Sequence, residues 1–286
     1  MILIELATRN SVLATAFERY KVVFALLILG GLGLMLGIGL AFAGQKFMVH
    51  MDPKQEELLK ALPGANCGAC GFPGCLGYAE ALALGNAEPN KCSVGGYKTT
   101  KAIGHILGVD VDEKVAEMAA VFCRGDRENC TDKYIYDGVS DCRAAIALSG
   151  GHKGCIYGCL GLGSCVRACP FDAIDWQPGN PPKINPDKCT GCGLCFKTCP
   201  KNVIGLMSRE HAVCVACKSL DKGREVRNIC KVGCIACGAC VKICPVNAIT
   251  LKDNLAVIDY SKCTGCGKCV EKCPTKTIIF IKARGK

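Results

Sequence analysis

The feature that most constrains this chain is a run of cysteines that recurs at a fixed spacing in its C-terminal half. Residues 189–200, 234–245 and 263–274 each read C-x2-C-x2-C-x3-C-P, and a fourth, irregular run ends at residues 169–170. Cysteines this close together make awkward disulfide partners but natural metal ligands. Since the segments around them have little apolar bulk, we expect bound metal to organise their fold.

The spacing favours [4Fe-4S] clusters over zinc. In bacterial two-cluster ferredoxins, the first three cysteines of such a run bind one cluster and the cysteine before proline binds the other. Zinc sites also use C-x-x-C pairs, but they do not call for interleaved runs that end in Cys-Pro. The chain has 26 cysteines, and their spacing indicates metal ligation in a reducing compartment rather than a secreted disulfide framework.

The prolines mark an internal repeat. The pattern Cys-Pro-x-x-x-Ile occurs four times, at residues 169–174, 199–204, 244–249 and 273–278. We therefore predict an α+β chain in which two tandem ferredoxin-like units, 151–208 and 230–286, each bind two clusters. An insert at 209–229 separates the two units.

The ferredoxin pattern predicts which cysteines of each unit bind the same cluster. For the second unit the pattern predicts two ligand sets: Cys234, Cys237, Cys240 with Cys273, and Cys263, Cys266, Cys269 with Cys244. For the first unit it predicts one regular set: Cys189, Cys192, Cys195 with Cys169.

The other run of the first unit has Leu162 where the second ligand belongs. Cys155 precedes the Cys-Pro cysteine of its repeat by fourteen positions, as Cys230 does in the second unit. We therefore expect Cys155 to replace the missing ligand, which completes the set Cys155, Cys159, Cys165 and Cys199. A three-iron cluster at this run is an open alternative, and Cys230 is left for another use.

A further, self-contained site lies upstream and consists of Cys67, Cys70, Cys75 and Cys92. Glycines between its first three cysteines let the backbone wrap closely and point amides at sulfur. Zinc stays open here, because the spacing alone does not exclude it. The sets described so far predict at least five clusters.

Six cysteines lie outside these five sets: Cys123, Cys130, Cys142, Cys214, Cys217 and Cys230. One interpretation is that all six are structural or incidental thiols. The other is a sixth cluster, for which the ligands we consider are Cys123, Cys142, Cys217 and Cys230.

Residues 22–43 contain no charged residue, and a helix of this length can cross a bilayer. We predict a transmembrane helix over 22–44, in which Gly33 and Gly37 offer a small-residue surface to another helix. A cleaved signal peptide is the alternative, but the apolar run exceeds the core of about 7–15 residues that signal peptides have. The charges on either side of the helix do not indicate its orientation in the membrane. Because iron–sulfur clusters are assembled in the cytoplasm, we expect the cysteine-rich C-terminal part of the chain to lie there.

The rest of the chain divides into an extension at 1–21, a linker at 45–62, a cluster domain at 63–110 and a connector at 111–150. Apolar spacing predicts helices over 76–84 and 110–122. The formal charge of +10 does not indicate a nucleic-acid partner, since five four-thiolate clusters would contribute about −10. No nucleotide-binding glycine motif lies between a strand and a helix, so we expect no flavin or NAD on this chain.

Longer stretches resemble a known family. Besides the glycine-rich apolar segment they are "DPKQEELLKALPGANCGACGFPGC" (52–75), "KYIYDGVSDC" (133–142), "GCLGLGSCVRACPFDAI" (158–174) and "CKSLDKGREVRNICKVGC" (217–234). They resemble the B subunits of Rnf complexes, which are ion-translocating ferredoxin:NAD+ oxidoreductases of the cell (inner) membrane. The resemblance implies a single-pass iron–sulfur protein that takes electrons from reduced soluble ferredoxin. It would relay them toward the other Rnf subunits (A, C, D, E and G) while the complex moves Na+ or H+.

An acidic ferredoxin should then dock on a basic surface near a terminal cluster. Lys262, Lys268, Lys272 and residues 282–286 are the candidates, although a solvated face that offsets cluster charge would have the same composition. Two other classes of function stay open. One is the electron-feeding subunit of a different membrane reductase, and the other is a corrinoid-type methyl carrier, against which the lack of a barrel-sized domain argues.

Overall fold

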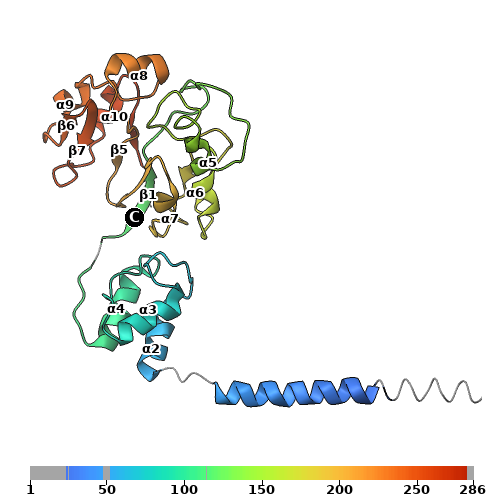
Figure 1. Cartoon of the computed structure of the whole chain (residues 1–286). Coiled ribbons are helices and arrows are strands. Elements are labelled where there is room, and N and C mark those ends of the chain that lie inside the picture. Colours follow the sequence, from blue (N-terminus) through green and yellow to red (C-terminus); the bar gives the residue numbers. More distant parts are fainter. Residues whose placement is uncertain (1–23, 25, 48–51, 114, 282–286) are drawn as a thin grey trace, which may run out of the picture. The chain divides into compact units, whose positions relative to one another are not determined.

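The computed structural model describes residues 24, 26–47, 52–113 and 115–281 (Figure 1). The chain divides into two compact units, residues 1–52 and residues 53–286. The small cluster domain and both ferredoxin-like units belong to the second of these.

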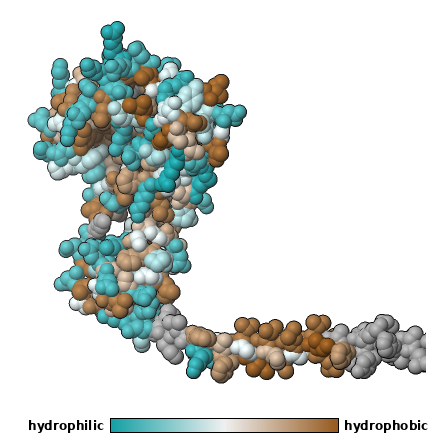
Figure 2. Space-filling model, in the orientation of Figure 1, coloured by the Kyte–Doolittle hydropathy of each residue, from teal (hydrophilic) through white to brown (hydrophobic). Residues whose placement is uncertain are grey.

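The described residues of the first compact unit include a helix that runs from Leu26 to Lys46. It is 21 residues long and strongly apolar, and none of its apolar stretch is buried against protein. Figure 2 shows it as an almost continuous hydrophobic surface. Its length and composition are those of a membrane span. The part of the predicted 22–44 span before residue 26, apart from Phe24, and the extension 1–21 lie outside the described residues.

Three helices build the small cluster domain: α2 (Pro53–Ala61), α3 (Gly74–Ala83) and α4 (Gly96–Leu107). Each helix contributes at least one nearly fully buried side chain to a common core: Leu58 from α2, Tyr78 from α3 and Ile103 from α4. The helix predicted over 76–84 is confirmed as α3, whereas α2 lies in the segment 45–62 predicted as a linker and packs into this core. This apolar core holds the cysteine-bearing loop between α2 and α3.

The segment before the first ferredoxin-like unit is a strand. β1 (Glu117–Val121) pairs antiparallel with β4 (Ile204–Ser208), and Met118 lies opposite Met207. The helix predicted over 110–122 is therefore wrong. Its apolar residues are buried by pairing with a strand far along the chain, and tertiary pairing of this kind overrides local helical spacing.

The two ferredoxin-like units have the same topology. Each contains a short antiparallel hairpin, made by β2 (Ile174–Asp175) and β3 (Lys183–Ile184) in the first unit and by β6 (Ile249–Lys252) and β7 (Leu255–Ile258) in the second. A second two-stranded sheet completes each unit with a strand from the segment before it: β1 pairs with β4 at the first unit, and β5 (Val213–Val215) pairs with β8 (Ile278–Phe280) at the second.

The insert between the units contributes structure to the second one. Its strand β5 (Val213–Val215) pairs antiparallel with β8 (Ile278–Phe280), as β1 pairs with β4. Its helix α8 (Gly223–Ile229) leads directly into Cys230. β1 and β5 therefore hold equivalent places in two successive copies of one fold.

A short helix surrounds the third cysteine of every run. α6 (Ser164–Arg167), α7 (Leu194–Thr198), α9 (Ala239–Ile243) and α10 (Lys268–Lys272) each follow a glycine with φ between 71° and 77°. The irregular run keeps this turn. An added Cβ at its glycine, Gly163, would lie 2.9 Å from the Trp176 ring in a backbone conformation that favours glycine. Leu162 therefore changes a ligand position without changing the local backbone.

Tyr78 ties α3 to the loop that carries Cys92. Its hydroxyl donates to the backbone oxygen of Glu88 at 2.6 Å and accepts from the backbone nitrogen of Lys91 at 3.3 Å. Only 1% of the residue is exposed, so water does not readily replace these bonds. Burial of the hydroxyl raises the pKa of Tyr78 to about 12, so the hydroxyl stays protonated, and a donor, even at moderately alkaline pH.

We expect Tyr78→Phe to lower the free energy of local opening of α3 by about 1–2 kcal/mol, because two hydrogen bonds of about 1 kcal/mol each are lost. Native-state hydrogen exchange of the cluster-loaded chain should then show α3 amides exchanging about 5–30 times faster. The matched control is Tyr97→Phe on α4, whose ring is 38% exposed. An equal effect of both substitutions would contradict the assignment.

Candidate iron–sulfur sites

The upstream site is a single pocket lined by all four of its predicted ligands, Cys67, Cys70, Cys75 and Cys92. Asn66 shapes the loop between them, since its Oδ1 accepts a hydrogen bond from the backbone nitrogen of Cys75 at 2.9 Å. An added Cβ at Gly74 would lie 2.9 Å from that same oxygen, so the close turn requires glycine. Burial raises the pKa of the Cys92 thiol, which means that a bound metal, more than solvent, must stabilise its thiolate.

The regular site of the first ferredoxin-like unit is also one pocket, lined by Cys169, Cys189, Cys192 and Cys195. Ile174 of β2 and Ile184 of β3 close it on the apolar side. The backbone nitrogen of Ala119 on β1 donates to the sulfur of Cys189 at 3.4 Å, and burial raises the pKa of Cys195 to about 12. The strand that was predicted as a helix thus supplies an N–H group to a ligand sulfur.

The irregular site brings together Cys142, Cys159, Cys165 and Cys199 around one pocket, next to Trp176. Cys142 begins α5 (Cys142–Ala147), which Asp141 caps by accepting from the backbone nitrogens of Arg143 and Ala144. Leu162 lines the same pocket, so the leucine side chain occupies the region from which the missing ligand would come.

Ser164 fixes Cys142 at this site. The Ser164 hydroxyl accepts from the backbone nitrogen of Cys142 at 2.8 Å and donates to Asp141 Oδ2 at 2.9 Å. Arg167 reinforces the link, because its guanidinium lies 3.7 Å from the same carboxylate. Hydrogen bonds from the Ala144 backbone and from Ser164 hold the pKa of the Asp141 carboxyl below its usual value.

This arrangement differs from the sequence expectation. Cys155, expected beside Cys159, Cys165 and Cys199, does not line their pocket, and Cys142 does. The repeat identifies Cys155 as the counterpart of Cys230, but spacing alone does not show which pocket it faces. Asp141, directly before Cys142, is an N-cap residue that can be recognised from the sequence. Its hydrogen bond with Ser164 cannot, because Ser164 lies on another cysteine run.

The second ferredoxin-like unit has a core that is itself rich in cysteine. Cys234, Cys240 and Cys269 are buried in it, with Cys244 and Cys273 packed against them. Backbone nitrogens donate to both Cys-Pro cysteines at the same distance, Ala248 to Cys244 and Thr277 to Cys273, each at 3.3 Å. The remaining predicted ligands are the half-buried Cys263 and the exposed Cys237 and Cys266. The crossed pairing of Cys244 and Cys273 stays a prediction.

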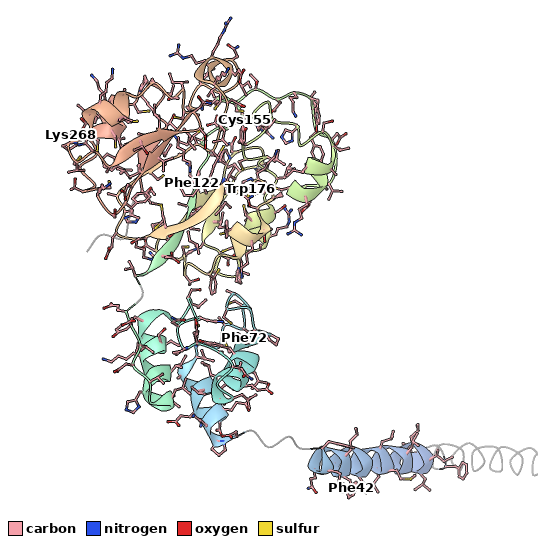
Figure 3. All side chains as sticks on the ribbon, turned by 60° about the vertical axis from the view of Figure 1, so that its left-hand side comes forward. Phe42, Phe72, Phe122, Cys155, Trp176 and Lys268 are labelled. Carbon is pink, nitrogen blue, oxygen red and sulfur yellow. The ribbon has the colours of Figure 1, made fainter. Side chains whose placement is uncertain are left out.

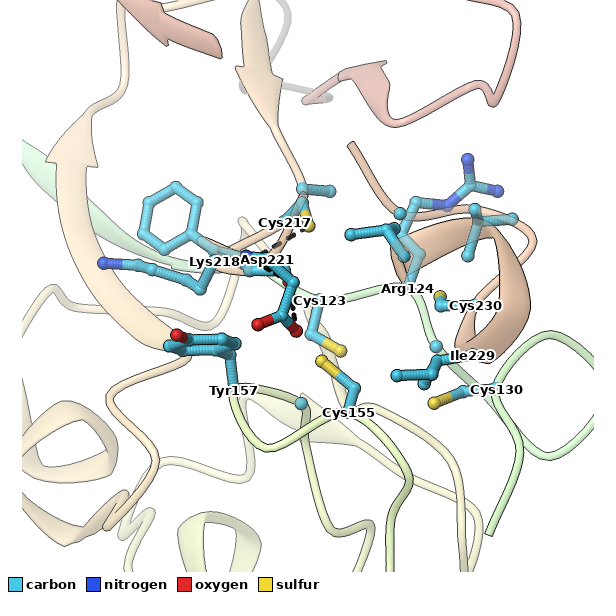
Figure 4. A pocket seen from close by; sticks show the side chains of 18 residues that line it. Cys123, Arg124, Cys130, Cys155, Tyr157, Cys217, Lys218, Asp221, Ile229 and Cys230 are labelled. Carbon is cyan, nitrogen blue, oxygen red and sulfur yellow. Dashed lines mark hydrogen bonds between the residues drawn. The ribbon is translucent and has the colours of Figure 1, made fainter. Parts of the chain in front are cut away.

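A further pocket lies where the two ferredoxin-like units meet, and its cysteines surround one space (Figure 4). They are Cys123, Cys130, Cys155, Cys217 and Cys230. Three of the four cysteines considered for a sixth cluster are therefore together, while the fourth, Cys142, lines the irregular site. Of the remaining spare cysteines, Cys214 is 1% exposed on β5 and does not line this pocket.

The grouping suits a cluster better than a single ion. Within the described ranges, no three His, Cys, Asp or Glu side chains converge closely enough to hold one metal ion. Around tetrahedral zinc every sulfur lies about 2.3 Å from the ion, so the sulfurs crowd together. In a cubane each cysteine binds a different iron, so the sulfurs lie farther apart. The four-cysteine pockets, with peptide N–H groups directed at sulfur, fit [4Fe-4S] clusters.

The three lysines predicted for partner docking lie at the surface. Lys262, Lys268 and Lys272 are all exposed, and Lys268 projects outward from α10 (Figure 3). Lys262 forms an ion pair with Asp259 at 3.1 Å. Residues 282–286 lie outside the described residues.

Comparison with known proteins agrees with this organisation. Residues 156–206 and 233–277 each match the family model of a 4Fe-4S dicluster domain, and residues 62–94 match one described as "Putative Fe-S cluster". The three matched segments correspond to the first ferredoxin-like unit, the second unit and the small cluster domain.

Similar proteins come from bacteria and an archaeon. The B subunit of the Na(+)-translocating ferredoxin:NAD(+) oxidoreductase complex of Acetobacterium woodii is 47% identical, covering 82% of this chain and 71% of that protein. The B subunit of the ion-translocating oxidoreductase complex of Methanosarcina acetivorans is 43% identical over 82% of this chain and 89% of its own length. The B subunit of the proton-translocating ferredoxin:NAD(+) oxidoreductase complex of Clostridium ljungdahlii is 41% identical over 85% and 86%. The chain carries multiple [4Fe-4S] clusters and belongs to the family of the B subunits of ion-translocating oxidoreductase (Rnf) complexes.

Proposed function

We propose that electrons from reduced ferredoxin enter a membrane-bound ferredoxin:NAD+ oxidoreductase, which moves Na+ or H+, through this chain. The observation that carries the proposal is the tandem pair of ferredoxin-like units, with pockets lined by four cysteines, in a chain related to named subunits of such complexes. The other subunits of an Rnf complex, A, C, D, E and G, are the partners that would receive the electrons.

The residues contribute binding, shielding and hydrogen bonds to this relay. When bound, each cluster accepts and releases one electron at a time. The cysteine sulfurs hold it, and the buried Cys165, Cys195 and Cys240 keep water away from it. Peptide N–H groups such as those of Ala119 and Thr277 donate to ligand sulfur, which stabilises the more negative, reduced state and raises the reduction potential.

Five ligand sets follow from the pockets and the repeat. One change from the sequence expectation is that Cys142, rather than Cys155, completes the irregular set. The proposed sets are Cys67, Cys70, Cys75 with Cys92; Cys142, Cys159, Cys165 with Cys199; Cys189, Cys192, Cys195 with Cys169; Cys234, Cys237, Cys240 with Cys273; and Cys263, Cys266, Cys269 with Cys244.

The apolar helix and the relatives indicate a membrane-associated protein. In the proposed arrangement the helix Leu26–Lys46 crosses the bilayer once and the clusters lie on the cytoplasmic side. The bound clusters support this side, because they are assembled in the cytoplasm and reduced ferredoxin is found there.

Ferredoxin would approach the last cluster through α10. Lys268 and Lys272 flank its ligand Cys269 and are exposed, whereas Lys262 is already paired with Asp259. Electrostatic steering of a weakly bound, acidic redox partner requires such a cationic surface and weakens as salt rises.

We expect Lys268→Glu with Lys272→Glu to lower the ferredoxin-dependent rate about tenfold at low salt, with the difference shrinking as ionic strength rises. The rate is measured on the purified complex with reduced ferredoxin and NAD+. The matched control is Lys98→Glu with Lys101→Glu, two exposed lysines of α4. An unchanged rate at low salt, or an equal loss in the control, would remove α10 as the docking surface.

A second prediction tests the irregular ligand set by rescue. Cys142→Ala should remove about four irons from the anaerobically purified chain, and adding Leu162→Cys should restore them, because that substitution recreates the regular ferredoxin run in the same pocket. Leu162→Cys should not restore the irons lost in Cys155→Ala. Rescue of the Cys155 variant instead of the Cys142 variant would return Cys155 to the irregular set.

A further inference from the structure

We propose that Cys123, Cys155, Cys217 and Cys230 hold an additional [4Fe-4S] cluster at the junction of the two ferredoxin-like units, and that it joins their electron paths. The binding site stands on its own geometry, whereas its role as a relay rests on the proposed function. All four cysteines line one pocket, which none of the five other ligand sets uses (Figure 4).

Two of these cysteines follow equivalent strands. Cys123 follows the last residue of β1 by two positions, and Cys217 follows the last residue of β5 by two positions. β1 and β5 pair in the same way with the final strands of their units, β4 and β8. Each unit therefore delivers one cysteine to the junction from the same place in its fold.

The other two cysteines are also equivalent. Cys155 and Cys230 each stand four positions before the first cysteine of their run, Cys159 and Cys234, with a glycine directly before that cysteine. Gly158 and Gly233 both line the pocket. An added Cβ at Gly233 would lie 2.4 Å from the Val226 side chain, so the loop packs too closely for a larger residue.

Equivalent hydrogen bonds occur on both sides. The backbone nitrogen of Cys159 donates to the sulfur of Cys123 at 3.4 Å, and the backbone nitrogen of Cys234 donates to the sulfur of Cys217 at 3.4 Å. Each unit thus contributes to the site from equivalent positions and with an equivalent hydrogen bond. Two cysteines from each half supply the four thiolates that a cubane requires.

Cys130 lines the same pocket but does not belong to these two equivalent pairs. It pairs with Cys230 through an isolated β-bridge, and the same backbone region joins the units through hydrogen bonds from Thr131 to Ile229 at 3.0 Å and from Lys231 to Asn129 at 2.8 Å. Cys230 has a counterpart in the first unit, Cys155, at the same distance before its run, whereas Cys130 lies in the segment before the first unit and outside this repeat. We therefore assign the fourth thiolate to Cys230.

Charged residues around the pocket suit a buried anion. Arg124 and Lys218, the residues that follow Cys123 and Cys217, line it together with one carboxylate, that of Asp221, so the net positive charge of the lining partly offsets the charge of about −2 that a four-thiolate cluster carries. The ammonium of Lys218 lies 5.1 Å from the centre of the Phe122 ring, which holds it near the pocket.

The same hydrogen bonds connect the junction to its neighbours. Cys159 is a proposed ligand of the irregular cluster, and Cys234 is a proposed ligand in the second unit. One peptide N–H therefore links each of these ligand residues to a sulfur of the junction site. A cluster here would shorten the electron path between the two units.

The test is the metal content of the whole chain, purified anaerobically with its complex. We expect about 24 irons and no zinc per wild-type chain, and about 20 irons after alanine substitution of any one of the four ligands. Cys214→Ala and Cys130→Ala serve as buried controls and should keep about 24 irons. A wild-type count near 20, zinc in place of iron, or full iron retention in Cys123→Ala and Cys217→Ala would overturn the site.

The iron content of the wild-type chain tests the proposed site even where a substituted chain does not fold. The relay role has its own readout, because Cys217→Ala should retain reduction of some clusters by ferredoxin while NAD+ reduction falls about tenfold or more. Loss of about four irons with an unchanged NAD+ reduction rate would refute the relay and keep the site. A complex with no ferredoxin-dependent activity at all, but about 24 irons per chain, would refute the proposed function alone.

Discussion

Bonds between iron and cysteine thiolates are the interaction on which the cluster-bearing part of this chain depends. Its strands are two to five residues long and its ferredoxin-type helices four or five, too short to be stable alone. Even the apolar core of the second unit is partly made of ligands, with Cys234, Cys240 and Cys269 buried inside it. The free energy of metal binding is therefore largely the free energy of folding.

Duplication explains how so many sites fit into one chain. The two units share hairpins, glycine turns and strand pairing, and each carries one cysteine after its added strand and one before its first run. A duplicated unit brings these extra cysteines face to face at the junction. Cys230, which precedes the first cysteine run of the second unit, thus gains a function together with its counterpart Cys155 rather than within its own run.

Features that depend on local cysteine spacing could be predicted from the sequence, whereas features that depend on contacts between distant segments could not. The ferredoxin runs and the upstream set could be read from sequence because their ligands lie close together along the chain. The choice between Cys142 and Cys155 could not, because it depends on hydrogen bonds that join Asp141 and Cys142 to Ser164 of another run. The strand β1 was predicted as a helix for a similar reason. Its apolar residues are buried by pairing with β4, far along the chain, and not by packing of one helical face.

Cysteine thiolates should bind iron and sulfide in every four-cysteine pocket, and Mössbauer spectroscopy of the anaerobically purified, iron-57-enriched chain measures this most directly. We predict that essentially all iron gives the signature of oxidised [4Fe-4S] clusters, which become paramagnetic on reduction. A spectrum dominated by isolated tetrahedral iron, or a chain whose pockets are filled with zinc, would contradict it.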